Sequence, residues 1–400
     1  MSRLPRRLQP AWPLAKRAHL AATVMLGVVW RRLAPLWGPR GLPRRASLQS
    51  ADTASVPSEG AVLHAGPAGE VIDRASAQGE PPLHPTFEAA RAAHLPDPYV
   101  LELSNGTVVG DYGATVTARG TFDFETSRYF SVYRWNEHPL FLRPRLPKPY
   151  RVDGTVASLA TRGGDRNYYH FLLEVLPRWA LVRQLVADAE IDAVFMPAAL
   201  GYERDLAAMA GIDADKILPT GSVPAVQASR LLIPSYPNMG ELQPRWLVEW
   251  VRATFQAVNT EELPRRLFVT RANTRRLIQG PAIEAMLRER GFVTIDPGTM
   301  SAQEQIDHFS AAEVIVGIHG AAMTNLVFAP VGVRVLELFA PRYVKHCYWA
   351  LSNGIPDARY RYLIGRGRPP RPGQPMYGLQ DDIDVDPDQV RRELDVLLDR

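Results

Sequence analysis

The stretch of sequence that decides the fold is Glu313–Phe339, which consists of E-V-I-V-G-I-H-G-A-A-M-T-N-L-V-F-A-P-V-G-V-R-V-L-E-L-F. Val314–Ile318 is a short apolar run rich in β-branched residues, which predicts a buried strand. Val333–Phe339 predicts a second buried strand. A short helix is expected between them, and Pro330 and Gly332 end it. The stretch therefore predicts a strand–helix–strand unit of an α/β sheet.

The turn between the first strand and the helix is a candidate ligand site. His319 and Gly320 end the strand, and the small residue Ala321 begins the helix. A strand that turns through glycine into a helix presents unpaired backbone N–H groups to an anion. In an open α/β sheet such a turn lies at the carboxyl end of a strand, where ligands bind. The same pattern also fits an ordinary unit in which Gly320 serves only the turn.

Composition limits the classes of function. The chain has 400 residues, of which 46% are hydrophobic and 22% charged, and this length predicts two domains. The net charge of +4 is modest and the basic residues are spread along the chain, so nucleic acid is not an expected partner. The single cysteine, Cys347, excludes an intramolecular disulfide and a Cys-rich metal site, and it fits a reducing compartment.

The amino-terminal segment is strongly basic around an apolar run. Ala18–Trp30 has thirteen residues, fewer than the twenty or so that a spanning helix needs, and Arg31-Arg32 stands where a signal peptide would be cleaved. Residues 1–45 are therefore expected either to lie as a helix on an anionic membrane surface, with Trp30 and Trp37 at the interface, or to form a disordered basic leader. A linker follows, and residues 1–84 are assigned to leader and linker.

Two strands are predicted to form a hairpin early in the first domain. Tyr99–Leu103 and Thr107–Val109 have strand-like composition and are separated by Ser104-Asn105-Gly106. Asn-Gly supplies the positive φ angles of a tight turn.

A candidate general base follows a predicted strand, Thr155–Ala160. The stretch Asn167–Arg178 consists of N-Y-Y-H-F-L-L-E-V-L-P-R, in which His170 and Glu174 are four residues apart. On a helix they share one face, and a carboxylate beside an imidazole raises its basicity. The alternative is an exposed ion pair on an amphipathic helix.

Three arginines form a candidate phosphate site. Arg271, Arg275 and Arg276 follow a predicted strand, Arg266–Thr270, at its carboxyl end. Guanidinium groups bind phosphate through paired hydrogen bonds. A solvated basic loop is the alternative.

A D-x-D sequence near the carboxyl terminus is not assigned to a metal. It comprises Asp382 and Asp384, and Asp386 follows. Asp386 is predicted to cap a helix with Pro387 at its first position, and Gln389–Leu398 is amphipathic. No metal site is therefore expected.

Two of these stretches resemble the recurring blocks of glycosyltransferase family 61, which includes capsular polysaccharide biosynthesis proteins and eukaryotic xylosyl- and N-acetylglucosaminyltransferases. One is N-x-x-H-x-x-x-E-x-L-P at Asn167–Pro177, and the other is the H-G-A block at His319. The arginine loop also resembles the family, although Gln279 stands where the family often has Asn. The E-Q pair at Glu304-Gln305 matches as well.

The resemblance implies a fold and a set of site residues. The fold is α/β, GT-B-like, with two facing doubly wound (Rossmann-like) domains. His170 and Glu174 would activate an acceptor hydroxyl, without a metal. The residues expected to bind the donor are Arg271, Arg275, Arg276, His319, Gly320, Ala321, Asn325 and Glu337.

The expected function is an inverting glycosyltransferase, hexosyl- or pentosyl-transferring, in capsular or other surface polysaccharide biosynthesis. Its partners would be a nucleotide-sugar donor and a glycan acceptor, and no cofactor is expected. The protein would be cytoplasmic and could be peripheral on the inner face of the cell membrane. The alternatives are an inactive nucleotide- or glycan-binding scaffold and a GT-B-like nucleotide-sugar epimerase. An acceptor-side domain is assigned to residues 85–240, a nucleotide-sugar-binding domain to 241–365, and a Pro-rich loop with a final helix to 366–400.

Overall fold

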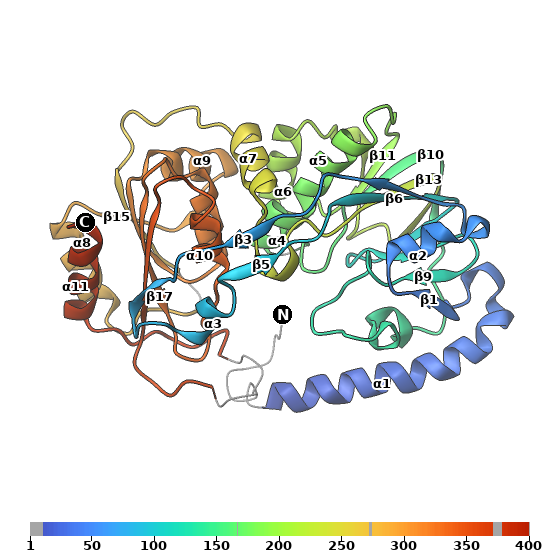
Figure 1. Ribbon diagram of the computed structural model, residues 1–400, viewed down its shortest axis with the longest axis horizontal. Coiled ribbons are helices and arrows are strands. Elements are labelled where there is room, and N and C mark those ends of the chain that lie inside the picture. The colour runs from blue at the N-terminus through green and yellow to red at the C-terminus, as the bar shows by residue number, and fades with distance from the viewer. Residues whose placement is uncertain (1–10, 166, 272–273, 371–377, 400) are drawn as a thin grey trace. The chain divides into compact units, whose positions relative to one another are not determined.

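The computed structural model describes residues 11–165, 167–271, 274–370 and 378–399. Its contacts divide the chain into two compact units (Figure 1). We call Leu14–Gly69 with Pro96–Asn238 the N-terminal unit, and Glu70–Leu95 with Met239–Arg400 the C-terminal unit. Each unit has its own sheet with helices packed on it, so the chain has the predicted α/β fold.

The C-terminal unit is built on a sheet whose described strands number six and pair only in parallel. Across the sheet these are β15 (Val293–Ile295), β14 (Arg266–Val269), β16 (Val314–Ile318), β17 (Arg334–Phe339), β18 (Arg359–Ile364) and β4 (Gln78–Glu80). Its helices are α7 (Arg245–Thr254), α8 (Gly280–Glu289), α9 (Ala302–Ala311), α10 (Cys347–Ser352) and α11 (Pro387–Leu398). Every residue of β16 is buried, as a parallel sheet covered on both faces requires.

The last helix begins as predicted. The side chain of Asp386 accepts a hydrogen bond from the backbone N–H of Asp388 at 2.9 Å, and Pro387 occupies the first turn. Val390, Leu394 and Leu397 are buried against the sheet, because they lie on one face of α11.

The segment Glu70–Leu95 joins the C-terminal unit, although the sequence placed it in the linker and the start of the first domain. Its strand β4 pairs in parallel with β18, and α3 (Pro85–Glu88) inserts Phe87 into the core. The Phe87 ring stacks on Tyr362 with centroids 4.5 Å apart. Two further short strands, β3 (Val71–Asp73) and β5 (Ala92–His94), pair with each other. A boundary at residue 84 therefore does not separate the two units.

The N-terminal unit contains a mixed sheet of ten strands in the described chain. Across the sheet they are β1 (Arg45–Ser47), β9 (Thr121–Asp123), β8 (Ala114–Val116), β7 (Thr107–Val109), β13 (Ala225–Pro234), β10 (Tyr150–Ser158), β11 (Ala193–Met196) and β12 (Ile217–Pro219), with β6 (Tyr99–Ser104) on β13 and β2 (Ala61–Ala65) on β6. Pairing is parallel from β13 to β12, and antiparallel where β13 meets β6 and β7. The expected parallel winding is thus limited to one half of this sheet.

The predicted hairpin at Asn105-Gly106 is wrong. The strands β6 and β7 both pair with β13 and not with each other, so the chain continues along one partner instead of folding back. Asn105 has φ of 53°, but Gly106 does not take a positive φ. A tight hairpin turn of that type needs positive φ at both central residues, so the pattern produces only a local irregularity.

The amino-terminal segment forms a long helix. Helix α1 (Trp12–Leu33) has 22 residues and runs into a 3₁₀ segment, η2 (Ala34–Arg40) (Figure 1). The disordered-leader interpretation is therefore wrong for this part of the chain. In the described residues, Leu14–Arg40 is the one helical stretch long and apolar enough, by length and composition, to cross a membrane.

Candidate active site

The helix that carries His170 and Glu174 is irregular. Asn167 caps it by accepting a hydrogen bond from the N–H of Tyr169 at 3.0 Å. After α4 (Tyr168–His170), residues Phe171–Val175 (η6) wind as a π-helix, with Leu176 N–H bonded to Phe171 O, and α5 (Leu176–Leu185) follows. Pro177 in the first turn of α5 cannot donate to a carbonyl of the preceding turn, which favours this widening. Single π-turns inside helices often occur at functional sites.

His170 and Glu174 lie together and are buried. Nδ1 of His170 is 3.0 Å from Oε1 of Glu174, and the two side chains are 5% and 1% exposed. The alternative of an exposed ion pair is therefore wrong. The imidazole packs against the ring of Phe130, with centroids 5.3 Å apart. Gly163, at φ of 78°, lies beside it, and a Cβ there would be 2.9 Å from Cδ2 of His170.

The carboxylate of Glu174 keeps its hydrogen-bonding capacity. Within the described chain neither of its oxygens accepts a well-aligned hydrogen bond, because the close Nδ1 of His170 is poorly oriented. Arg178, one turn further on, donates instead to the carbonyls of Pro234 and Ala160. Burial lowers the pKa of Arg178, and the charge of Glu174 is among the charges that oppose this shift. A buried carboxylate with unused acceptor positions is suited to receive a proton or hydrogen bond from a substrate hydroxyl.

In the C-terminal unit, His319 lies at the carboxyl end of β16, as predicted. Its Nδ1 is 2.5 Å from Oε1 of Glu337 on the neighbouring strand β17. The hydroxyl of Tyr360, on β18, donates to Oε2 of Glu337 at 2.5 Å. Within the described chain, the hydrogen-bond partners of Glu337 are thus His319 and Tyr360. The three residues come from adjacent parallel strands: His319 directly follows β16, Glu337 lies in the second half of β17, and Tyr360 is the second residue of β18.

Burial sets the proton positions in this cluster. Burial raises the pKa of Glu337 well above its ordinary range. Burial also lowers the pKa of His319 well below its ordinary value, and the positive charges of Arg275, Lys345 and Arg271 lower it further. Both groups therefore favour their neutral forms. A protonated Glu337 donates to Nδ1 of His319, which leaves the imidazole proton on Nε2. Within the described chain Nε2 has no hydrogen-bond partner, so it can donate to an anionic ligand.

Two arginines lie next to this cluster without a carboxylate partner. In the described residues neither Arg271 nor Arg275 forms an ion pair with Asp or Glu. Burial, followed by the charge of Arg275, lowers the pKa of Arg271 to about 10, so it stays protonated at neutral pH. Burial also lowers the pKa of Arg275, whose guanidinium lies 5.2 Å from the ring centroid of Tyr343. A partly buried cation is costly unless an anion compensates it, and neither arginine forms an ion pair among the described residues.

Gly320 provides the space for one of these arginines. Its backbone is extended, with φ of 168°, so the glycine is not required by conformation. A Cβ at this position would instead collide with the guanidinium of Arg271, whose Nη1 donates to the carbonyl of His319 at 3.4 Å. The following helix, η10 (Ala321–Phe328), begins at Ala321 and has 3₁₀ geometry. The space that the missing side chain leaves at Gly320 is thus occupied by Arg271.

Comparison with known families agrees with this geometry. Residues 168–336 match the model of the glycosyltransferase 61 family. The chain carries a glycosyltransferase 61 domain. The transferase class follows from this family, and the resemblance seen in the two sequence blocks is confirmed. No curated protein matches the chain.

The glycosyltransferase 61 domain includes residues from both units. His170 and Glu174 stand near its beginning in the N-terminal unit, and His319 stands near its end in the C-terminal unit. Glu337 lies one residue beyond the matched range. The family model thus covers the two buried histidines that the sequence analysis selected.

Two further candidates have structural contacts in the glycosyltransferase 61 domain. Arg276 is exposed, and its backbone N–H donates to the side chain of Asp382 at 3.1 Å, so it ties the arginine loop to the D-x-D segment. Asn325 is fully buried and donates to Oε1 of Gln305 and to the carbonyl of Ala322, at 2.8 and 3.0 Å. The matching E-Q pair has a similar role, because Glu304 forms a capping box with Ser301.

Sequence reasoning missed Tyr360 and Tyr343. Tyr360 lies on a strand with alternating Arg and Tyr, and nothing local distinguishes it from the neighbouring Tyr362. Tyr343 lies in an aromatic and basic stretch that precedes α10, which begins at Cys347. Among the described residues no group of three or more His, Cys, Asp or Glu side chains could hold a metal ion.

Proposed function

We propose that the protein is an inverting glycosyltransferase that moves a sugar from a nucleotide-sugar donor to a hydroxyl of a glycan acceptor in capsular or other surface polysaccharide biosynthesis. The observation that carries this proposal is the pair of partly buried arginines, Arg271 and Arg275, that form no ion pair with a carboxylate of the described chain beside His319. A diphosphate would supply the missing negative charge.

The C-terminal unit would bind the donor. The guanidinium of Arg271 and the Nε2–H of His319 would donate hydrogen bonds to phosphate oxygens. The positive charge of Arg275 would add to the electrostatic attraction for the diphosphate. The same groups would balance the negative charge that develops on the leaving nucleoside diphosphate, so they would stabilise the transition state without a metal. Glu337 acts through His319, because it sets which nitrogen carries the proton.

The N-terminal unit would supply the base. Glu174 has unused acceptor positions, and the imidazole of His170 lies beside it, with Nδ1 3.0 Å from Oε1. One base that deprotonates the acceptor hydroxyl during a single displacement is the requirement of an inverting reaction. The proposal therefore needs the two units to meet around one substrate pair, as two facing domains of the GT-B type would.

Nucleotide-sugar binding tests the donor half. Isothermal titration with UDP-, GDP- and CMP-sugars should show binding of at least one donor, and Arg271→Ala and Arg275→Ala should each weaken it by about 10- to 100-fold, since a charged hydrogen bond contributes about 1.5–3 kcal/mol. The control is Arg288→Ala, which changes an exposed arginine of α8 in the same unit. Absence of binding by the whole panel, or equal loss in the control, would contradict the proposal.

The stereochemical outcome tests the mechanism. Proton NMR of the first product should show the anomeric configuration opposite to that of the donor sugar. Retention would exclude the single displacement with Glu174 and His170 as base. Product formed without any acceptor would favour an epimerase instead.

A further inference from the structure

Helix α1 has two different faces in the N-terminal unit. One face packs on the segment Trp135–Phe141: a Cβ on Gly27 would be 3.0 Å from Cβ of Phe141, and the guanidinium of Arg31 lies 4.6 Å from the centroid of Trp135. The remaining surface of α1 and η2 exposes large apolar side chains. These are Leu14, Met25, Leu26, Val28, Val29, Leu33, Leu36 and Trp37, each 38–77% exposed. So many exposed large apolar side chains on one helix and the segment that follows it indicate a partner.

The charge around α1 specifies the kind of partner. The first 50 residues contain ten of the 46 basic residues and no acidic residue, so the remaining 350 carry 36 basic and 42 acidic residues. The amino-terminal segment is thus attracted to an anionic surface, whereas the rest of the chain is not. Apolar side chains framed by arginine and lysine are the pattern of a helix at the surface of an anionic bilayer.

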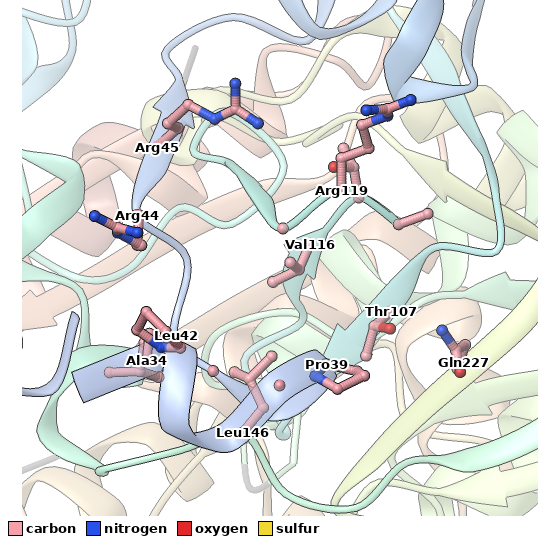
Figure 2. Close-up of a pocket in the computed structure, with 16 residues that line it drawn as sticks. Ala34, Pro39, Leu42, Arg44, Arg45, Thr107, Val116, Arg119, Leu146 and Gln227 are labelled. Atoms are coloured by element: carbon pink, nitrogen blue, oxygen red, sulfur yellow. The ribbon is translucent and has the colours of Figure 1, made fainter. Parts of the chain in front are cut away.

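A basic cavity adjoins the end of this apolar surface. It has a volume of about 670 Å³ and lies between η2, the segment that follows it and strands of the N-terminal sheet (Figure 2). Arg44, Arg45 and Arg119 are drawn around it, and no acidic side chain lines it. Among the described residues none of the three forms an ion pair, and Nε of Arg119 donates to the carbonyl of Ser58 at 2.9 Å.

The carboxylate beside this cavity is already hydrogen-bonded. Thr117 lines the cavity and donates to Glu59, whose other oxygen accepts from Thr121 at 2.8 Å. Glu59 therefore does not neutralise the arginines through an ion pair. Because Pro35 and Gly38 line the cavity, Leu36 and Trp37 lie between lining residues in the chain, and the apolar surface continues to its edge.

We propose that this cavity binds the anionic headgroup of a membrane lipid while the exposed apolar side chains of α1 and η2 lie in the bilayer interface. A helix lying on the bilayer fits better than a spanning one. The run between Arg17 and Arg31 has thirteen residues, about 20 Å at 1.5 Å per residue, whereas a hydrocarbon core is about 30 Å thick. Spanning would also strip α1 of its contacts with Trp135 and Phe141. The proposal does not depend on the glycosyl donor.

Vesicle co-sedimentation of the full-length protein tests the proposal. Binding should be strong to vesicles of phosphatidylcholine with phosphatidylglycerol and weak to phosphatidylcholine alone. The triple change Arg44→Glu, Arg45→Glu and Arg119→Glu should lower binding to the anionic vesicles by about a hundred-fold, since each basic residue near the surface contributes about 1 kcal/mol. The control is Arg151→Glu, an exposed arginine of β10 that does not line the cavity.

Three further measurements separate the alternatives. Met25→Ser with Leu36→Ser should reduce vesicle binding at an unchanged thermal midpoint, because both side chains are about 70% exposed or more.

Inorganic phosphate at millimolar concentration should compete only weakly with the vesicles. Full displacement would indicate a site for a soluble anion and overturn the lipid assignment. Alkaline carbonate should release the protein from membranes, and resistance to it would show a spanning helix.

Discussion

Glu337 is fully buried between His319 and Tyr360, and its neutral form suits both contacts. We expect Glu337→Gln to keep nearly all stability, because a glutamine amide can donate to Nδ1 of His319 and accept from Tyr360. Glu337→Ala should lower the free energy of unfolding by about 3 kcal/mol, because each buried group that loses its partner costs about 1–3 kcal/mol. Urea unfolding of the two variants measures the difference. Equal destabilisation by both would mean that the carboxyl is ionised.

The pH dependence gives an independent check on the same residue. A carboxyl whose folded pKa lies above its ordinary 4.5 stabilises the fold at low pH, and this contribution is lost as the pH rises through the folded pKa. His319 acts in the opposite direction, since its pKa is lowered from 6.5 and its contribution falls as the pH decreases. The stability of the wild type relative to Glu337→Gln should therefore fall with rising pH, by at most about 1.4 kcal/mol per pH unit.

Glu174 offers a second prediction at the scale of a residue. Glu174→Gln should lower kcat by about 10²- to 10⁴-fold, the range for loss of a general base, while donor affinity stays unchanged. Steady-state kinetics with titration of the donor separates the two quantities. Glu190→Gln, an exposed position in the same unit, is the control. Intact turnover in Glu174→Gln and in His170→Ala would show that neither residue is the base.

At the scale of the element, the turn from β16 into η10 is packed against Arg271, which lies in the loop after β14. Gly320→Ala should leave the fold intact, because alanine adopts the extended backbone observed there, but it should displace Arg271 and weaken donor binding by about tenfold or more. Calorimetric titration measures this loss. Gly280→Ala is the control in the same unit, since its Cβ would meet only Leu277 at 3.6 Å. Unchanged affinity would remove Arg271 from the donor site.

Several elements show how far local sequence patterns predict the structure. Strands β14 and β16 and helix α11 were predicted within a few residues, because apolar periodicity and caps act locally. The Asn105-Gly106 pattern predicted a hairpin, yet β6 and β7 both pair with β13. The free energy of pairing with a long buried strand exceeds that of one tight turn, so tertiary pairing overrides the turn propensity.

At the scale of the whole molecule, the C-terminal unit depends on a segment far away in sequence. Phe87→Ala should destabilise this unit by about 4 kcal/mol, because a fully buried phenylalanine leaves a large cavity in its aromatic cluster. Hydrogen exchange resolved by peptide should show faster opening of β17 and β18, with β10 and β13 unaffected. Phe122→Ala, in the core of the N-terminal unit, should give the reverse pattern. Uniform loss of protection in both variants would mean that the units unfold together.

The sequence by itself determined the α/β alternation of the C-terminal unit, the turn at His319, the pair His170 and Glu174, and the family to which residues 168–336 belong. These features depend on residues close together in the chain, whose periodicity and spacing can be read directly. Only the tertiary structure decided that Tyr360 and His319 share Glu337, that Gly320 makes room for Arg271, and that Glu70–Leu95 joins the C-terminal sheet. Those contacts depend on which strands become neighbours. That choice is made by the burial of the whole sheet, to which each local segment contributes only a small part.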